Sequence, residues 1–74
     1  MWTVTTTGDL PDDFDRRRHS DSRGAWDDYH GRILALETGG FSGLAETAVN
    51  YGREWVADLH RGTTRITVTI ERTA

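Results

Sequence analysis

The most regular pattern of apolar and polar positions lies near the C-terminus, in the stretch TTRITVTIER. Ile66, Val68 and Ile70 alternate there with threonine and charged residues. A period of two with many β-branched side chains is typical of a strand that buries one face. The N-terminal WTVTTT has the same character, with Trp2 and Val4 on one face. We therefore expect a strand at each end of the chain, and both strands in one sheet.

Residues 43–61 show a different spacing, which predicts a long amphipathic helix. Its apolar positions recur at intervals of three or four: Leu44, Ala48, Tyr51, Trp55 and Leu59. Ser42 is a suitable N-cap, and the cationic residues before Gly62 are typical of a helix C-terminus. Gly52 inside this segment costs about 1 kcal/mol relative to alanine, which indicates that another backbone packs closely there.

The stretch DLPDDFDRRRH predicts a short N-terminal helix over about residues 10–19. Pro11 suits a first helical turn, and three acid–base pairs at i, i+4 spacing each stabilise a helix by about 0.3 kcal/mol. These pairs are Asp12 with Arg16, Asp13 with Arg17, and Asp15 with His19. Leu10 and Phe14 share one face of this helix, so we expect them to hold it against the domain.

The middle of the chain, residues 26–37, fits two structures. A helical stripe is formed by Trp26, Tyr29, Ile33 and Leu36, whereas RILALE fits a buried strand. We favour a strand at about 31–37, because Gly31 weakens a helix and because two strands seldom form a stable sheet alone. The expected fold is α+β: a single domain, residues 1–74, with a three-stranded mixed sheet, the long helix on one face and the short N-terminal helix.

The composition limits the available chemistry. The chain has no cysteine, which excludes disulfides and thiolate zinc sites, and no lysine, which excludes Schiff bases and P-loop contacts. The formal charge of −3 is too small to select a class of partner. No apolar run reaches membrane-spanning length and the N-terminus has no features of a secretion signal, so we expect a cytoplasmic protein.

The candidate sites match no known motif. Arg16, Arg17, Arg18 and Arg23 have the chemistry to bind phosphate, but acids one helical turn earlier are expected to neutralise the triplet, and no aromatic residue lies between the arginines.

Asp27, Asp28 and His30 would have to meet in a pocket to form an active site, and they lack metal-ligand spacing. The glycines of TGGFSG offer free N–H groups to an anion, although a simple turn is favoured. We expect no enzyme, catalytic residue, metal or cofactor.

We favour a non-enzymatic interaction or regulatory protein, a class that includes inhibitors, adaptors and regulatory subunits, small phage-encoded ones among them. The C-terminal strand is expected to have a free edge that pairs with a second copy or a protein partner, giving a homodimer. The expected partner-binding residues are Arg16, Arg17, Arg18, Arg23, Trp26, Arg65, Thr67 and Thr69. The alternatives are nucleic-acid binding through Arg16–Arg18 on a threonine-rich platform, and an acidic mimic of nucleic acid.

Overall fold

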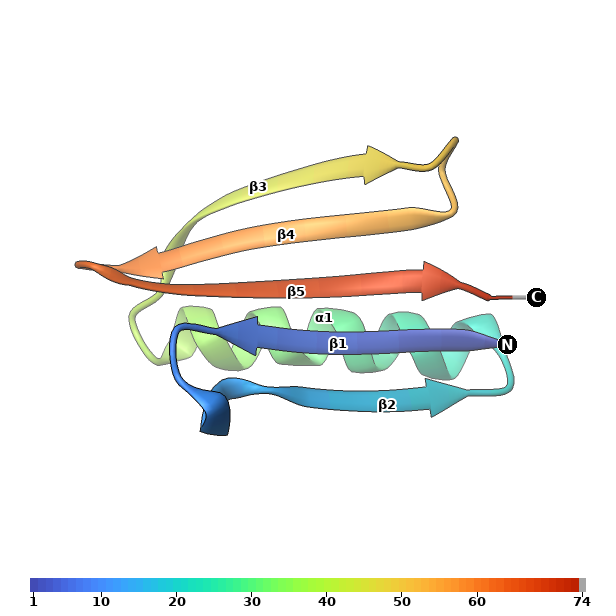
Figure 1. The fold of residues 1–74 in the computed structure, drawn as a ribbon, viewed down its shortest axis with the longest axis horizontal. Helices are drawn as coiled ribbons and strands as arrows, with labels where there is room; N and C mark the ends of the chain where they lie inside the picture. Colours follow the sequence, from blue (N-terminus) through green and yellow to red (C-terminus); the bar gives the residue numbers. More distant parts are fainter. Residues whose placement is uncertain (74) are drawn as a thin grey trace.

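The computed structural model describes residues 1–73, apart from the side chains of residues 44 and 45. Within this part, five strands form one antiparallel sheet in the order β2-β1-β5-β4-β3 (Figure 1). The strands are β1 (Trp2–Gly8), β2 (Asp15–His19), β3 (Ser42–Val49), β4 (Glu54–Arg61) and β5 (Thr64–Arg72). A 3-10 turn, η1 (Pro11–Asp13), follows β1, and the helix α1 (Ser22–Thr38) connects the edge strands β2 and β3.

The two ends of the chain pair at the centre of the sheet. β1 runs antiparallel to β5, with Val4 opposite Ile70 and Thr5 opposite Thr69. The expectation of two terminal strands in one sheet is therefore confirmed. β5 has β4 on its other side, so both of its edges are hydrogen-bonded within the chain. The predicted free edge of the C-terminal strand is wrong for this reason.

The core lies between the sheet and α1, which packs mainly on β5, β1 and β2. Its members are Val4, Ala25, Tyr29, Ile33, Phe41, Ala57, Leu59, Ile66, Val68 and Ile70. Three tryptophans pack at its border, where the ring of Trp26 lies 6.2 Å from that of Trp2 and 6.2 Å from that of Trp55. Partial burial of these large aromatic surfaces adds to the apolar stabilisation of the core.

The predicted long helix over residues 43–61 is wrong, because this segment forms β3, a turn and β4. Trp55, Ala57 and Leu59 alternate along β4 and all face α1 or the core, which is a period of two. The turn is made by Asn50, Tyr51 and Gly52, all at positive φ.

Gly52 accordingly has a different role from the one its spacing indicated. Its φ is 81°, and an added Cβ would meet nothing within 4 Å. The glycine is required by the left-handed turn and not by a closely packed neighbour.

The predicted short helix over residues 10–19 is also wrong. Only η1 has helical character, and residues 15–19 pair with β1 as the edge strand β2. Leu10 is 66% exposed and Phe14 is 53% exposed, so neither residue holds a helix against the core. None of the three i, i+4 pairs is among the ion pairs of the described residues, because an extended chain places residues four apart at a distance of about 13 Å.

The favoured strand at residues 31–37 is wrong as well, and the helical alternative is correct. Ala25, Tyr29 and Ile33 are buried at intervals of four and place one stripe of α1 on the sheet. Gly31 is exposed, with open space around its Cα, so it weakens the helix without interrupting this stripe. The three-stranded mixed sheet is thus replaced by five antiparallel strands with one α-helix, although the fold remains α+β.

The start of α1 depends on one side-chain cap. Asp21 Oδ1 accepts a hydrogen bond of 2.7 Å from the Gly24 N–H. Removal of this cap in Asp21→Ala should lower the free energy of unfolding by about 1 kcal/mol, because a helix N–H loses its acceptor. Urea denaturation measures the change. Asp27→Ala, which alters an exposed carboxylate of the same helix, should have a much smaller effect.

Candidate functional site

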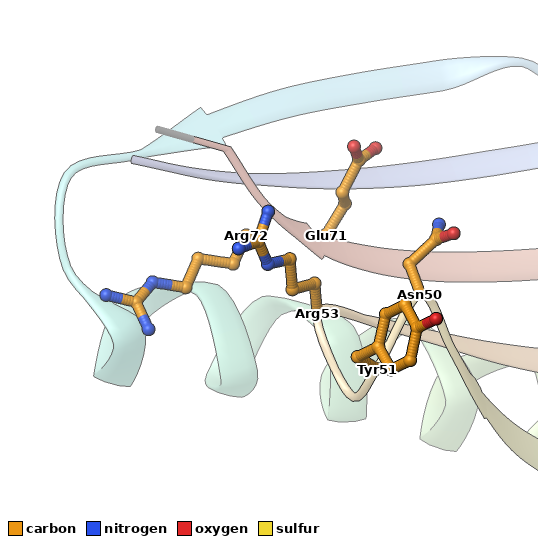
Figure 2. Close-up of a pocket in the computed structure, with 5 residues that line it drawn as sticks. All are labelled: Asn50, Tyr51, Arg53, Glu71 and Arg72. Atoms are coloured by element: carbon orange, nitrogen blue, oxygen red, sulfur yellow. The ribbon is translucent and has the colours of Figure 1, made fainter.

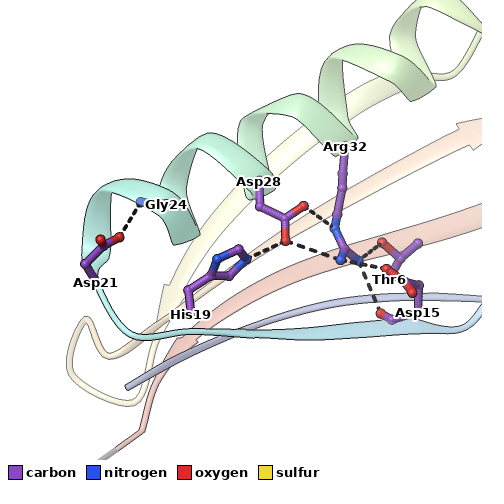
Figure 3. A network of polar contacts seen from close by, with 7 residues as sticks. All are labelled: Thr6, Asp15, His19, Asp21, Gly24, Asp28 and Arg32. Atoms are coloured by element: carbon purple, nitrogen blue, oxygen red, sulfur yellow. Dashed lines mark hydrogen bonds and ion pairs between the residues drawn. The ribbon is translucent and has the colours of Figure 1, made fainter.

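The most extensive polar cluster joins α1 to β1 and β2 (Figure 3). Arg32 lies at its centre and is only 13% exposed. Its Nε donates to Asp28 Oδ1 at 2.9 Å, and its Nη1 donates to Thr6 Oγ1 at 2.8 Å. Its Nη2 forms an ion pair of 2.7 Å with Asp15 Oδ2. One guanidinium therefore contacts three elements.

His19 completes this cluster from the end of β2. Its Nε2 lies 2.8 Å from Asp28 Oδ2, and since an ionised carboxylate can only accept, Nε2 carries the proton. Burial by itself would raise the pKa of the Asp28 carboxyl. The hydrogen bonds and positive charges of Arg32 and His19 outweigh that effect, so the pKa of Asp28 is lowered.

The His19–Asp28 pair resembles half of a catalytic triad but lacks the geometry of one. A triad needs the second ring nitrogen to face a nucleophile. Nδ1 of His19 instead lies beside Gly24, 3.5 Å from where an added Cβ would stand, and it makes no hydrogen bond to a nucleophile among the described residues. The cluster is arranged to hold the edge strand against the helix.

The acids and histidine expected in a possible active site point in different directions. Asp27, Asp28 and His30 lie on a helix, so the side chains of Asp28 and His30 diverge instead of sharing one side of a strand. Asp28 faces β2, whereas the ring of His30 packs 5.6 Å from that of Trp26. Within residues 1–73, no three His, Asp or Glu side chains are grouped so that they could hold a metal ion.

The arginine triplet is divided between the two faces of the sheet. Arg16 and Arg18 lie opposite Thr5 and Thr3 on the face away from α1, which we call the open face, whereas Arg17 lies opposite the buried Val4. All three arginines are exposed. No ion pair joins any of them to a carboxylate among the described residues.

Two of the three acids expected to neutralise the triplet have other partners. Asp15 pairs with Arg32, and Asp13 Oδ2 accepts from the Leu10 N–H at 3.0 Å. An aromatic neighbour that the sequence reasoning missed is also present, since the guanidinium carbon of Arg16 lies 5.4 Å from the ring centroid of Phe14. The alternation of residues 14, 16 and 18 on one strand face is the pattern that would have revealed it.

The other expected partner-binding residues are dispersed. Arg23 is exposed in the first turn of α1, and Trp26 belongs to the aromatic border of the core. Arg65, Thr67 and Thr69 lie on the open face of the central strand β5. The Thr67 hydroxyl donates to Asp58 and the Thr69 hydroxyl donates to the Thr5 carbonyl.

The glycine-rich TGGFSG does not precede a helix, because residue 42 begins a strand. The Gly40 and Phe41 N–H groups donate to the carbonyls of Glu37 and Leu36 at the end of α1. The helix N-terminus that an anion site would need is therefore absent from this described segment.

A shallow hollow of about 580 Å³ lies beside the β3–β4 turn (Figure 2). It is lined by Asn50, Tyr51, Arg53, Glu71 and Arg72. Tyr51 is fully exposed, so the hollow opens to solvent and encloses no ligand. It has none of the convergent, buried polar groups that are typical of a small-molecule site.

The two outer edges of the sheet differ in charge. β2 has five residues, of which the four at positions 15–18 are charged. β3 has eight residues and one ionisable side chain, Glu46, which accepts a hydrogen bond of 3.1 Å from the Tyr29 hydroxyl. Burial and the bond to Glu46 raise the pKa of Tyr29, which keeps the hydroxyl protonated as a donor.

Comparison of the chain with protein-family models, with curated proteins and with solved structures gives no match. Among the described residues, no helix combines the length and the apolar character needed to cross a membrane.

The Asp28 cluster makes the stability of the fold depend on pH. Because folding lowers the pKa of Asp28, the ionised carboxylate stabilises the fold above the unfolded pKa of 3.8, and this contribution is lost as the pH falls through the folded value. Asp28→Asn should lower the free energy of unfolding at neutral pH by about 1–3 kcal/mol and flatten its decline below about pH 4. Urea denaturation across pH tests this, with Asp27→Asn as control. If the free energy of unfolding of Asp28→Asn declined at low pH as steeply as that of the original chain, the dependence would not come from Asp28.

Proposed function

We propose that this chain is a non-enzymatic interaction protein that forms a homodimer by pairing β3 with the β3 of a second copy. The observation that carries the proposal is the contrast between the two sheet edges. Charged side chains on an edge strand oppose pairing with other chains. The four charges of β2 protect that edge, whereas β3 has a longer edge, a single ionisable residue and no proline.

In an antiparallel ladder, successive residues direct their N–H and C=O groups alternately toward a neighbouring strand and away from it. This alternation indicates which backbone groups of β3 are free. A two-residue turn joins β4 to β5, so the flanking pair, Arg61 and Thr64, exchanges hydrogen bonds. Alternation across β4 then directs the N–H and C=O of Thr47 toward β4. The same groups of Glu46 and Ala48 face outward, where a further strand can bind them.

A two-fold axis near Thr47 gives a favourable register for self-pairing. Antiparallel pairing about this position sets Glu46 of one copy opposite Ala48 of the other. The two Glu46 carboxylates are then diagonal neighbours and not direct partners, which reduces their repulsion. The helix packs mainly on β5, β1 and β2, so it leaves this edge accessible.

Replacement of Ala48 by proline tests the dimer, because proline has no N–H to donate to a second copy. The Ala48 side chain is exposed and its N–H makes no bond to β4 in this register, so the monomer fold should persist. We expect light scattering to show a dimer for the original chain and a monomer for Ala48→Pro.

Ala48→Val is the matched control, since it keeps the N–H and favours a strand. It should remain dimeric. A monomeric original chain at high micromolar concentration, or an Ala48→Pro variant that is folded by circular dichroism and still dimeric, would refute the proposal.

A further inference from the structure

The β2 side of the open face has a row of side chains suited to an anionic polymer. Phe14, Arg16 and Arg18 occupy alternate positions of an extended chain, so they share one face at intervals of about 6.7 Å. Thr5 and Thr3 of β1 lie beside the two arginines, and both are half-buried. We call these five residues the arginine row.

The positive charge of the arginine row is not cancelled locally. The nearest acid in sequence, Asp15, points to the other face and pairs with Arg32. The open face also has acids on β5 and β4, and the closest in register to Arg18 is Glu71, two strands away. Thr3 stands between them, and among the described residues no ion pair joins Arg18 to Glu71.

Phe14 adds a feature that simple charge does not explain. The residue is 53% exposed, and the guanidinium carbon of Arg16 lies 5.4 Å from the centroid of its ring. An exposed aromatic next to unpaired arginines is the combination with which proteins bind single-stranded nucleic acids, because the ring stacks on an unpaired base and the arginines contact phosphates. Threonine hydroxyls at the same surface can donate to phosphate oxygens.

We propose that the arginine row binds single-stranded nucleic acid, with phosphates at Arg16 and Arg18 and a base on Phe14. The stacking step selects single strands, since the bases of a duplex are not free to leave their neighbours. The site lies on the sheet edge opposite β3, so it does not depend on the proposed homodimer.

A fluorescently labelled oligothymidylate, titrated by anisotropy at several salt concentrations, tests this proposal. Binding should weaken with salt, because neutralised phosphates release counterions. The double variant R16A/R18A should weaken binding and reduce the salt slope by about 1.4, since each phosphate contact on a single strand contributes about 0.7. Arg17→Ala removes one positive charge from the opposite face of the sheet, so it should leave the salt slope nearly unchanged.

Phe14→Leu separates stacking from charge. It keeps an apolar side chain and should weaken binding about tenfold while leaving the salt slope unchanged. Polyglutamate of matched length should compete poorly, because it has the charge without the bases. Absence of binding at low salt, equal effects of Arg16→Ala and Arg17→Ala, or equal competition by polyglutamate would each overturn the proposal. Circular dichroism confirms that each exposed-surface variant is folded.

Discussion

The pairing of β1 with β5 is the constraint on which the rest of this fold depends. It brings the chain ends together at the centre of the sheet, where the Thr73 N–H also donates to the Met1 carbonyl at 2.8 Å. Both strands bury β-branched residues on one face, and that face requires a cover. A 17-residue helix is about 26 Å long, close to the length of the nine-residue β5, so α1 covers the central strands along most of their length, and it contacts β3 through the hydrogen bond from Tyr29 to Glu46.

The terminal strands could be predicted from sequence because only one period fits them. Ile66, Val68 and Ile70 alternate without a competing helical stripe. The segment that forms β3 and β4 has both periods, since Trp55 and Leu59 are four apart and also two positions either side of Ala57. The deciding feature was the turn at Asn50 and Gly52, whereas the helical interpretation took Gly52 as a site of close backbone packing. Pairing with β5 then selected the strand.

The candidate sites were less predictable because their contacts join distant parts of the chain. Arg32 binds Thr6, which lies 26 positions earlier, and no local pattern encodes that contact. The arginine row was hidden for a different reason. A helical assumption placed Asp12 beside Arg16 and dispersed residues 14, 16 and 18 around an axis, whereas a strand aligns these three on one face. The choice of a helix in place of a strand therefore led to the opposite conclusion about whether nearby acids neutralise the arginines.

The charges of β2 serve the two proposals in complementary ways. An edge that carries three arginines resists strand pairing. A contact between β2 of one copy and β3 of the next, which would repeat into a filament, is therefore disfavoured. The symmetric β3–β3 contact instead closes at two copies. In that arrangement the two-fold axis is perpendicular to the sheet, and both open faces point the same way. The two arginine rows would then lie at the outermost strands of one continuous surface, antiparallel to each other. A flexible single strand long enough to span that surface would contact both rows at once, and such bivalent contact raises affinity without any new residue.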